Sequence, residues 1–214
     1  SPSLTCFSEP PANTAYGANH GIIYSYDGDW IVLGTDETGT NANCRLVFYK
    51  RNADGTWPVT TGQMTVYQSI RTSTFGPNQI QAVDLDASAG RCAAISGTSD
   101  DLVILDYNSS TNLWEEHSNF TSVIDTFDVA INGDYCVAIH GGTGALSLFH
   151  YDTNSDSWSL EQSAYTAYRG YNVFTSYVTG GIDLFVNEGK LWLLYKGVGD
   201  INDGAQSYRS SLTE

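Results

Sequence analysis

Residues Gly133–Gly141 read GDYCVAIHG, and residues Ala145–Trp158 read ALSLFHYDTNSDSW. In the first stretch a short apolar segment follows a Gly-Asp pair. The second alternates apolar and polar residues before a run of Asn, Asp and Ser. Apolar and aromatic segments between such turn formers are typical of β-strands. This part of the chain therefore predicts an antiparallel meander of strands joined by polar turns.

The same pattern occurs four times along the chain. Besides the stretch above, it is found at Gly28–Gly34 with Cys44–Trp57, at Gly90–Gly97 with Asp101–Trp114, and at Gly189–Gly197 with Ala205–Glu214. We expect the Trp that ends each of the first three units, Trp57, Trp114 and Trp158, to open the fourth strand of its unit. Trp114 and Trp158 lie 44 residues apart, and so do Gly97 and Gly141. Four strands in a period of about 44 residues are typical of propeller blades. We therefore predict an all-β protein, a β-propeller of about four blades of four antiparallel strands.

We interpret residues 1–214 as a single propeller domain. Its units span about residues 21–70, 79–124, 125–175 and 180–214. The fourth unit ends after three predicted strands. We therefore expect residues 1–20 to supply the closing strand and its lead-in, which would leave no open sheet edge. The pattern also leaves open a half-ring that dimerises, a fragment, and a part of a larger propeller.

The chain is acidic, with 24 Asp and Glu against 9 Lys and Arg and a net charge of −15. Such a charge repels nucleic-acid phosphates, and no apolar run approaches the roughly 20 residues of a membrane span. We expect neither nucleic-acid binding nor membrane insertion. Four Cys favour an oxidising compartment, and sequons at Asn108 and Asn119 permit N-glycosylation. These features predict an extracellular or cell-surface protein.

The segments GDWIVLGTDETGT (Gly28–Thr40) and CRLVFYKRNADGTW (Cys44–Trp57) resemble the FG-GAP repeat of integrin-α-type propellers. The third unit is similar, the second is looser, and the fourth lacks the Trp. The resemblance implies a propeller used in adhesion and built of blades that often bind calcium. The calcium loop D-x-D-x-D-G is absent here, and the nearest run, Asp84–Ser88, looks like strand alternation.

Calcium remains the one cofactor to consider, because acidic loops follow the second strand of several units. Ca²⁺ takes six to eight oxygen ligands, and these loops could ring one face of the propeller, although a solvated loop is the interpretation we favour. The candidate ligands are Asp36, Asp100, Asp101, Asp200 and Asp203.

No motif for zinc binding, nucleophilic catalysis or phosphate binding is present in the sequence. The candidate ligand-binding residues are therefore aromatic side chains suited to sugar stacking and one histidine near a strand end: Tyr165, Tyr168, Tyr171 and His140. An elongated outer strand and a hydrogen-bonded structural histidine are the alternative interpretations.

Cys92 and Cys136 occupy equivalent positions in successive units, which favours buried thiols, although a disulfide between neighbouring blades stays open. Pairing of Cys6 with Cys44 would tie the N-terminal stretch to the first unit. Four Cys allow three connectivities, and the sequence does not choose among them.

Repeat architecture without catalytic motifs predicts a non-catalytic binding, adhesion or assembly module that presents its loops to a protein or a glycan. One alternative is a propeller-type hydrolase or lyase acting on a polysaccharide. Another is a structural subunit of a fibre or surface layer. A homo-oligomer or a larger assembly is compatible with each of these hypotheses.

Overall fold

The computed structural model describes residues 23–34, 45–60, 63–71, 80–96, 101–121, 126–140, 145–166, 182–187, 190–197 and 206–211. Every regular element in these ranges is a β-strand, so the prediction of an all-β chain is confirmed. Within the same ranges there is no helix with the length and apolar character needed to cross a membrane.

The described strands form three four-stranded antiparallel sheets, one three-stranded sheet and a small two-stranded hairpin, so the prediction of four blades of four strands each is not met. We call the first four of these sheets blades 1 to 4. Blade 1 contains β1 (Ile23–Asp27), β2 (Trp30–Gly34), β3 (Leu46–Lys50) and β6 (Gln68–Ile70). Blade 2 contains β7 (Ile80–Asp86), β8 (Arg91–Ser96), β9 (Leu102–Asn108) and β10 (Leu113–Phe120). Blade 3 contains β11 (Thr126–Asn132), β12 (Tyr135–His140), β13 (Ala145–Asp152) and β14 (Ser157–Thr166). Blade 4 contains β15 (Ile182–Asn187), β16 (Lys190–Gly197) and β17 (Gln206–Ser211).

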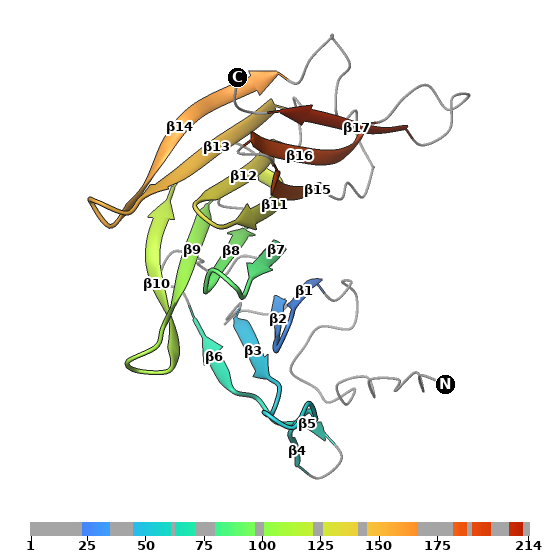
Figure 1. The fold of residues 1–214 in the computed structure, drawn as a ribbon, viewed down its shortest axis with the longest axis vertical. Helices are drawn as coiled ribbons and strands as arrows, with labels where there is room; N and C mark the ends of the chain where they lie inside the picture. Colours follow the sequence, from blue (N-terminus) through green and yellow to red (C-terminus); the bar gives the residue numbers. More distant parts are fainter. Residues whose placement is uncertain are drawn as a thin grey trace, which may run out of the picture.

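The blades follow one another in a curved row (Figure 1). Their first strands form its inner side, because β1 packs against β7, β7 against β11, and β11 against β15. Blade 1 and blade 4 lie at opposite ends of this row in Figure 1, so the described residues form an open arc. The predicted closing strand, residues 1–20, lies outside the described residues.

Tight turns with glycine in the left-handed region connect the first two strands of the blades. Gly28 (φ 56°) follows Asp27, and Gly133 (φ 54°) follows Asn132. Asp27 pairs with Trp30 and Asn132 pairs with Tyr135, so the two loop residues are Gly28-Asp29 and Gly133-Asp134. Two-residue hairpins with a type II′ turn prefer glycine at the first loop position, because the twist of this turn matches that of the flanking strands. A β-carbon at either glycine would meet no neighbouring atom within 4 Å, so the requirement for glycine comes from the backbone angle alone.

Two apolar layers lie between the blades. The layer between blades 1 and 2 contains Val32, Phe48 and Trp114, and the layer between blades 2 and 3 contains Ile104 and Phe149. Alternate residues of blade 2 enter the two layers, because successive side chains of a strand point to opposite faces. Blade 2 is therefore buried on both faces, which explains why its strands are almost continuously apolar.

The repeated tryptophans fill these layers at two of their three positions. Trp114 is 1% exposed and Trp158 is 6% exposed. The prediction that Trp57 opens a fourth strand is wrong, because the fourth strand of blade 1 is β6 and a small hairpin of β4 (Val59–Thr60) and β5 (Gln63–Met64) intervenes. Pro58 follows Trp57 and has no N–H with which to continue a ladder.

Carboxylates at the ends of the inner strands join successive blades. Asp27 ends β1 and accepts a hydrogen bond from the backbone N–H of Ala87 in blade 2, at 2.7 Å. Asp86 ends β7 and accepts one from the N–H of Gly133 in blade 3, also at 2.7 Å. Asp84 accepts from the Ile131 N–H at 2.8 Å. The run interpreted in the sequence as the nearest match to a calcium loop is thus a blade-joining strand.

A disulfide between Cys92 and Cys136 is not formed, because both are free, fully buried thiols. Each faces the blade before its own, so Cys92 lies in the layer between blades 1 and 2 and Cys136 in the layer between blades 2 and 3. Packed sheets stand about 10 Å apart, more than the roughly 7 Å that a disulfide spans between Cα atoms. Cys6 and Cys44 lie outside the described residues.

We expect Cys92 and Cys136 to resist alkylation in the folded protein. Burial raises the pKa of both thiols well above its ordinary value, and the thiolate is the reactive form. Iodoacetamide labelling followed by peptide mass spectrometry should find both unmodified at pH 8 and fully modified in denaturant. Labelling of either residue at the same rate in both conditions would contradict the buried placement.

Candidate functional site

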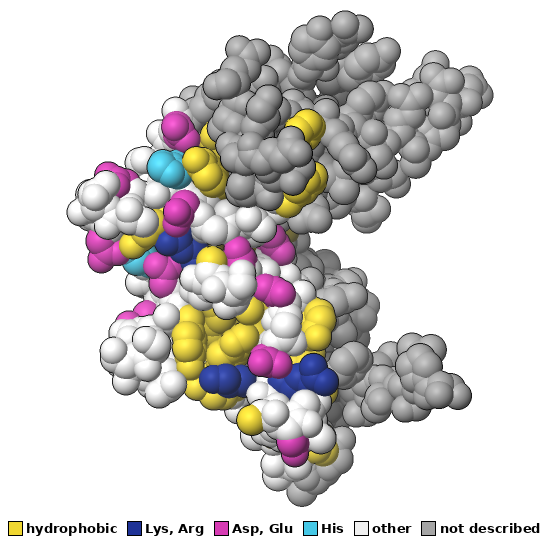
Figure 2. Space-filling model, in the orientation of Figure 1, with side chains coloured by type: hydrophobic (Ala, Val, Ile, Leu, Met, Phe, Trp, Pro, Cys, Tyr) yellow, Lys and Arg dark blue, Asp and Glu magenta, His cyan; other side chains and the backbone are white. Residues whose placement is uncertain are grey.

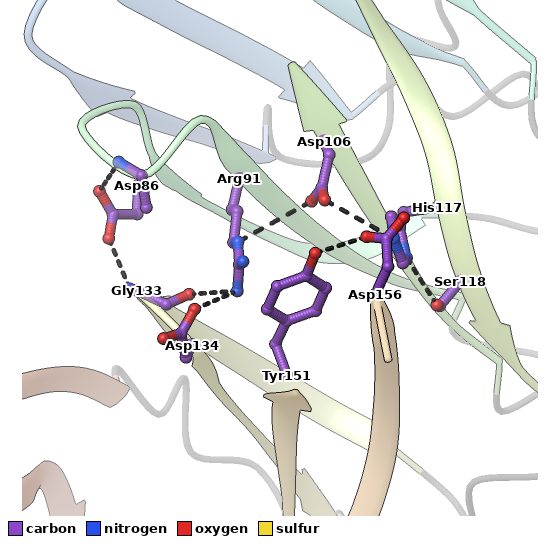
Figure 3. Close-up of polar contacts among 10 residues, drawn as sticks. Asp86, Arg91, Asp106, His117, Ser118, Gly133, Asp134, Tyr151 and Asp156 are labelled. Atoms are coloured by element: carbon purple, nitrogen blue, oxygen red, sulfur yellow. Dashed lines mark hydrogen bonds and ion pairs between the residues drawn. The ribbon is translucent and has the colours of Figure 1, made fainter. Parts of the chain in front are cut away.

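A cluster of charged and aromatic side chains crosses the boundary between blades 2 and 3 (Figure 3). We call these five residues the polar boundary cluster: Arg91, Asp106 and His117 from blade 2, and Tyr151 and Asp156 from blade 3. They come from the strands β8, β9, β10 and β13 and from the turn between β13 and β14. Its titratable side chains contact one another across two blades, so we consider it first.

Arg91 lies at the centre of this cluster. Its guanidinium is 3.9 Å from the ring centroid of Tyr151 and 4.9 Å from that of Trp158. The Nη1 atom donates to the Gly133 carbonyl at 2.9 Å and lies 3.0 Å from Asp134 Oδ1. A flat guanidinium can stack on rings and donate in its own plane at the same time, so Arg91 links blade 2 to blade 3.

His117 and Tyr151 both contact one carboxylate oxygen of Asp156. The Tyr151 hydroxyl donates to Asp156 Oδ1 at 2.5 Å, and His117 Nε2 is 3.2 Å from the same atom. The hydrogen bonds from Tyr151 and His117 lower the pKa of Asp156. The hydrogen bond to Asp156, together with burial, raises the pKa of Tyr151 to about 12. Asp156 is therefore the ionised, accepting member of the cluster.

Asp106 is in a different electrostatic state. Burial raises its pKa, and the charges of His117 and Arg91 offset this only in part. His117 Nε2 is 3.9 Å from Asp106 Oδ2, and Arg91 Nε is 4.0 Å from Oδ1, an atom with no hydrogen-bond partner among the described residues. Two carboxylates with pKa values shifted in opposite directions are one signature of acid–base sites.

The cluster also contains the order of groups used in nucleophilic catalysis. Ser118 Oγ is 2.9 Å from His117 Nδ1, and Asp156 contacts the other ring nitrogen. This is the hydroxyl–imidazole–carboxylate sequence of a triad. The boundary between blades 1 and 2 shows whether such an arrangement is needed for catalysis or only for the docking of two blades.

A matching cluster lies at the boundary between blades 1 and 2. The Lys50 ammonium is 4.9 Å from the ring centroid of Trp30, 5.4 Å from that of Tyr67 and 5.3 Å from that of Tyr107. The Tyr107 hydroxyl donates to Asn112 Oδ1 at 3.2 Å. Figure 2 shows an apolar area on the lower half of the molecule with Lys and Arg side chains beside it. Here, too, a cation lies among aromatic rings.

The strand register shows that the two clusters occupy equivalent positions. Lys50 pairs with Trp30 across β2 and β3, just as Asp106 pairs with Arg91 across β8 and β9. The cation is thus on the third strand at the first boundary and on the second strand at the next. The cation, Lys50 or Arg91, thus lies on a different strand of its blade at each boundary, but at both boundaries it contacts aromatic rings.

The groups supplied by the following blade are equivalent as well. The Tyr107 N–H donates to the carbonyl just before β8, and the Tyr151 N–H to the carbonyl just before β12. Asn112 (φ 56°) and Asp156 (φ 50°) have left-handed backbones in corresponding turns. Each tyrosine hydroxyl donates to the side chain of the left-handed residue in its own turn.

The proposed nucleophile also has an equivalent, and it is structural. Ser118 and Gln68 follow His117 and Tyr67 at matching places in the outer strands. Gln68 accepts from the Trp114 N–H at 2.8 Å and donates to the Trp114 carbonyl at 2.8 Å. Because the same positions at the first boundary hold groups that only join blades, docking explains the polar boundary cluster without catalysis.

The structure describes the backbone of two of the four ligand-binding residues predicted from the sequence. His140 ends β12 and Tyr165 lies in β14, whereas Tyr168 and Tyr171 lie outside the described residues. Of the candidate calcium ligands the structure describes Asp101, which is buried. No group of three His, Cys, Asp or Glu side chains arranged to hold a metal occurs in the described ranges.

The sequence reasoning missed the boundary clusters, although it contained a signal for them. LDYNSSTNLW and FHYDTNSDSW align with a tyrosine, an Asn or Asp, and a tryptophan in register. Reading these three positions together predicts a tyrosine that bonds to a left-handed Asn or Asp beside a buried tryptophan.

We expect substitution of the two cluster carboxylates to change stability in opposite directions. A raised pKa means that ionised Asp106 costs stability at neutral pH, so Asp106→Asn should raise the melting temperature at pH 7 by up to about 3 °C. The gain should vanish below the ordinary aspartate pKa of about 3.9, where the carboxyl is already protonated.

Asp156→Asn is the matched control. The pKa of Asp156 is lowered, so its ionised form stabilises the fold above the unfolded-state pKa, and its removal should lower the melting temperature at pH 7. Calorimetry of both variants at pH 7 and pH 3.5 measures the two signs. A loss of stability in Asp106→Asn at pH 7 would show that its attraction to His117 and Arg91 outweighs burial.

No family model and no curated protein matches this sequence. Solved structures do match. The crystal structure of Saccharomyces cerevisiae Sqt1 matches with a TM-score of 0.55 and 8% identity, over 81% of this chain and 41% of that one. A 6-phosphogluconolactonase candidate from Bacteroides uniformis matches with a TM-score of 0.54 and 10% identity, over 89% and 54%. A protein from Lactobacillus plantarum matches with a TM-score of 0.48 and 14% identity, over 86% and 54%.

The chain has a propeller-like fold. The neighbours are propeller-like all-β proteins, and they support the architecture predicted from the repeat, although no comparison supports the FG-GAP family in particular. The chain spans about half the length of the solved proteins that it matches. At these identities the likeness concerns the fold alone.

Proposed function

We propose that this chain is a non-catalytic interaction module that binds another protein through the face of blade 1 turned away from blade 2. The observation that carries the proposal is Tyr26, which is 54% exposed on that face. Ile31 in β2 pairs with Tyr26, and Tyr49 in β3 pairs with Ile31. The equivalent row of blade 2, Leu85, Cys92 and Leu105, is buried beneath blade 1.

Tyr26 is exposed on this face, whereas Val47 is buried there, and Trp57 adjoins Tyr26. Trp57 is half-buried and contacts the Tyr26 ring with 6.5 Å between centroids. Aromatic residues are enriched at protein interfaces because they bury a large area with few rotatable bonds. We name Tyr26, Ile31, Leu33, Tyr49 and Trp57 the leading face, and we propose it as the binding surface.

A protein ligand is favoured over a glycan because aromatic rings elsewhere in blades 1 and 2 are already covered by a cation. A sugar would stack on a free ring face, but at the boundary of blades 1 and 2 the Lys50 ammonium lies over Trp30, Tyr67 and Tyr107. Glycan binding through Tyr165, Tyr168 and Tyr171 and an extracellular location remain hypotheses from the sequence. Of the two sequon residues, Asn108 is half-buried and Asn119 is exposed.

A hydrolase is the second candidate, and the order Ser118–His117–Asp156 is the observation that favours it. We expect no turnover of p-nitrophenyl esters or glycosides by the purified protein, because the equivalent residues of the first boundary only join blades. Turnover that is lost in Ser118→Ala but kept in Ser110→Ala would establish the hydrolase instead.

The proposed function can be tested by photo-cross-linking from the leading face. Tyr26→p-benzoylphenylalanine should give a discrete protein adduct after illumination in an extract of the producing cells. The matched control places the same group at Leu160, which is 48% exposed on β14. Absence of an adduct from position 26, or the same adduct from both positions, would overturn the proposal. Mass spectrometry of the adduct identifies the partner.

A further inference from the structure

We infer that Asn132 is a site of spontaneous deamidation, which blade 2 blocks for as long as it is packed against blade 3. Asn132 and Gly133 are the only Asn-Gly pair in the sequence. Asn132 ends β11, and Gly133 is the first residue of the turn to β12. This modification site is on blade 3 and is independent of the partner-binding face proposed on blade 1.

Deamidation of an Asn-Gly pair needs no reactant other than water. The backbone nitrogen of Gly133 forms a bond to Cγ of Asn132, and the side-chain amide leaves as ammonia, which takes up the proton of that nitrogen. Water then opens the succinimide ring and leaves aspartate or isoaspartate at position 132. Glycine as the second residue favours ring closure, because it has no side chain to hinder the approach.

The attacking nitrogen is held by a carboxylate of blade 2. The Gly133 N–H donates to Asp86 Oδ2 at 2.7 Å, and Asp86 is buried at the end of β7. Burial opposes ionisation of Asp86, but its hydrogen bonds outweigh this effect and lower its pKa, so it is charged at neutral pH. The nitrogen attacks as its anion, and a negative charge beside it opposes the loss of its proton. Asp86 therefore makes Gly133 a poorer nucleophile.

The carbonyl group of the same glycine is held by a second side chain of blade 2. Arg91 Nη1 donates to the Gly133 carbonyl at 2.9 Å (Figure 3), and the Arg91 guanidinium lies 3.9 Å from the centroid of the Tyr151 ring. Ring closure requires the Gly133 nitrogen to turn toward the Asn132 side chain. This movement breaks the bond to Asp86 and disturbs the one that Arg91 makes to the carbonyl.

The products of the reaction would weaken the boundary that prevents it. Deamidation replaces a neutral amide by a carboxylate beside a turn that contains Asp134 and contacts Asp86. The added charge is unfavourable in a chain that already carries a net charge of −15. Asn132→Asp, which has the aspartate product, should therefore melt at a lower temperature than its neutral counterpart Asn132→Gln. Equal melting temperatures in calorimetry would contradict this weakening.

Peptide mass spectrometry of the purified full chain during storage at pH 8 tests the inference. It measures the conversion of the Asn132 amide to an acid, and fragmentation distinguishes isoaspartate from aspartate. We expect fast conversion of the wild type in urea and slow conversion without it. Without urea, Asp86→Ala should convert about 10-fold faster than the wild type or more, because a hydrogen bond to a charged group no longer has to be broken first.

Two further variants separate the effect of Asp86 from a general loss of stability. Trp114→Ala should lose more stability than Asp86→Ala but keeps the bond from Gly133 to Asp86, so its Asn132 should convert more slowly than that of Asp86→Ala. Asp86→Asn keeps the shape of the side chain without its charge and should convert faster than the wild type. It provides the comparison if the alanine variant does not fold.

The opposite results would overturn the inference. Equal conversion of the wild type with and without urea would show that the fold gives no protection. Conversion in the Asp86 variants no faster than in the wild type would show that the carboxylate does not restrain the nitrogen, and slower conversion would make Asp86 a base that promotes the reaction. Conversion in Trp114→Ala as fast as in Asp86→Ala would assign the protection to global stability alone.

Discussion

Trp114→Ala should lower the stability of the folded chain by about 4 kcal/mol, the usual loss when a buried tryptophan is truncated. Trp114 stacks on Phe48 with 4.9 Å between centroids and meets Trp30 edge-on at 5.4 Å. Both neighbours belong to blade 1, so the truncation leaves a cavity between two sheets rather than within one. For a domain of this size the melting temperature should fall by about 10 °C.

Trp57→Ala is the matched control, because Trp57 occupies the equivalent position but is only half-buried. Its truncation should cost less than that of Trp114, about 2 kcal/mol, because its side chain is less completely buried. Calorimetry at a protein concentration below any self-association measures both variants. Equal losses would contradict the assignment of Trp114 to a packed blade boundary and of Trp57 to an open face.

The fold could be predicted from the sequence because its signals are local and repeated. Each hairpin is marked by turn residues, and each strand has the apolar character of its layer, so four aligned copies reinforce one another. Trp57 shows where this reasoning failed. Its alignment with Trp114 was correct, but Pro58 and the β4–β5 hairpin redirect the chain after it. An insertion changes the path of the chain without disturbing the repeat on either side.

The candidate site could not be predicted because its members come from different blades. Arg91 and Tyr151 are 60 positions apart, and only the packing of blade 3 against blade 2 brings the guanidinium over the ring. The equivalence of Lys50 and Arg91 was hidden as well, since the cation moves from one strand to the next between boundaries. The sequence reasoning searched for motifs close together in the chain, and these contacts are long-range.

One polar feature of the blade boundaries was visible in the sequence, but its role was not. Asp84 and Asp86 were assigned to one face of a strand with Leu85 on the other, and the structure confirms this alternation, with Leu85 buried between blades 1 and 2. Both carboxylates accept backbone N–H bonds from blade 3. The run considered in the sequence as the nearest match to a calcium loop therefore joins blade 2 to blade 3.

Asp86→Ala should remove about 2–3 kcal/mol of stability, because it leaves three donors without their acceptor. The buried carboxylate accepts from the Gly133 N–H at 2.7 Å, the Ala89 N–H at 3.0 Å and the Ser88 hydroxyl at 2.6 Å. Only the first of these donors is on blade 3. Loss of the side chain therefore weakens the turn after β7 and the attachment of blade 3 in a single step.

The effect of Asp86→Ala should depend on pH with a defined sign. Burial opposes ionisation of Asp86, but the hydrogen bonds from Ser88, Gly133 and Ala89 outweigh it and lower its pKa. A lowered pKa gives stability that is present above the unfolded-state value of about 3.9 and is lost as pH falls through the folded-state value. The difference between wild type and variant should thus shrink in acid.

Asp152→Ala distinguishes blade joining from ordinary turn formation. Asp152 accepts from the Asn154 N–H, the Asn154 side chain and the Ser155 hydroxyl, all within one exposed turn. Its loss exposes these donors to water, which replaces the bonds, so Asp152→Ala should cost clearly less stability than Asp86→Ala. Urea unfolding of both variants at pH 7 and pH 3.5 gives the comparison. If Asp152→Ala lowers the free energy of unfolding as much as Asp86→Ala does, the hydrogen bond from Gly133 to Asp86 adds no stability of its own. Blade 3 is then held on blade 2 by apolar packing alone.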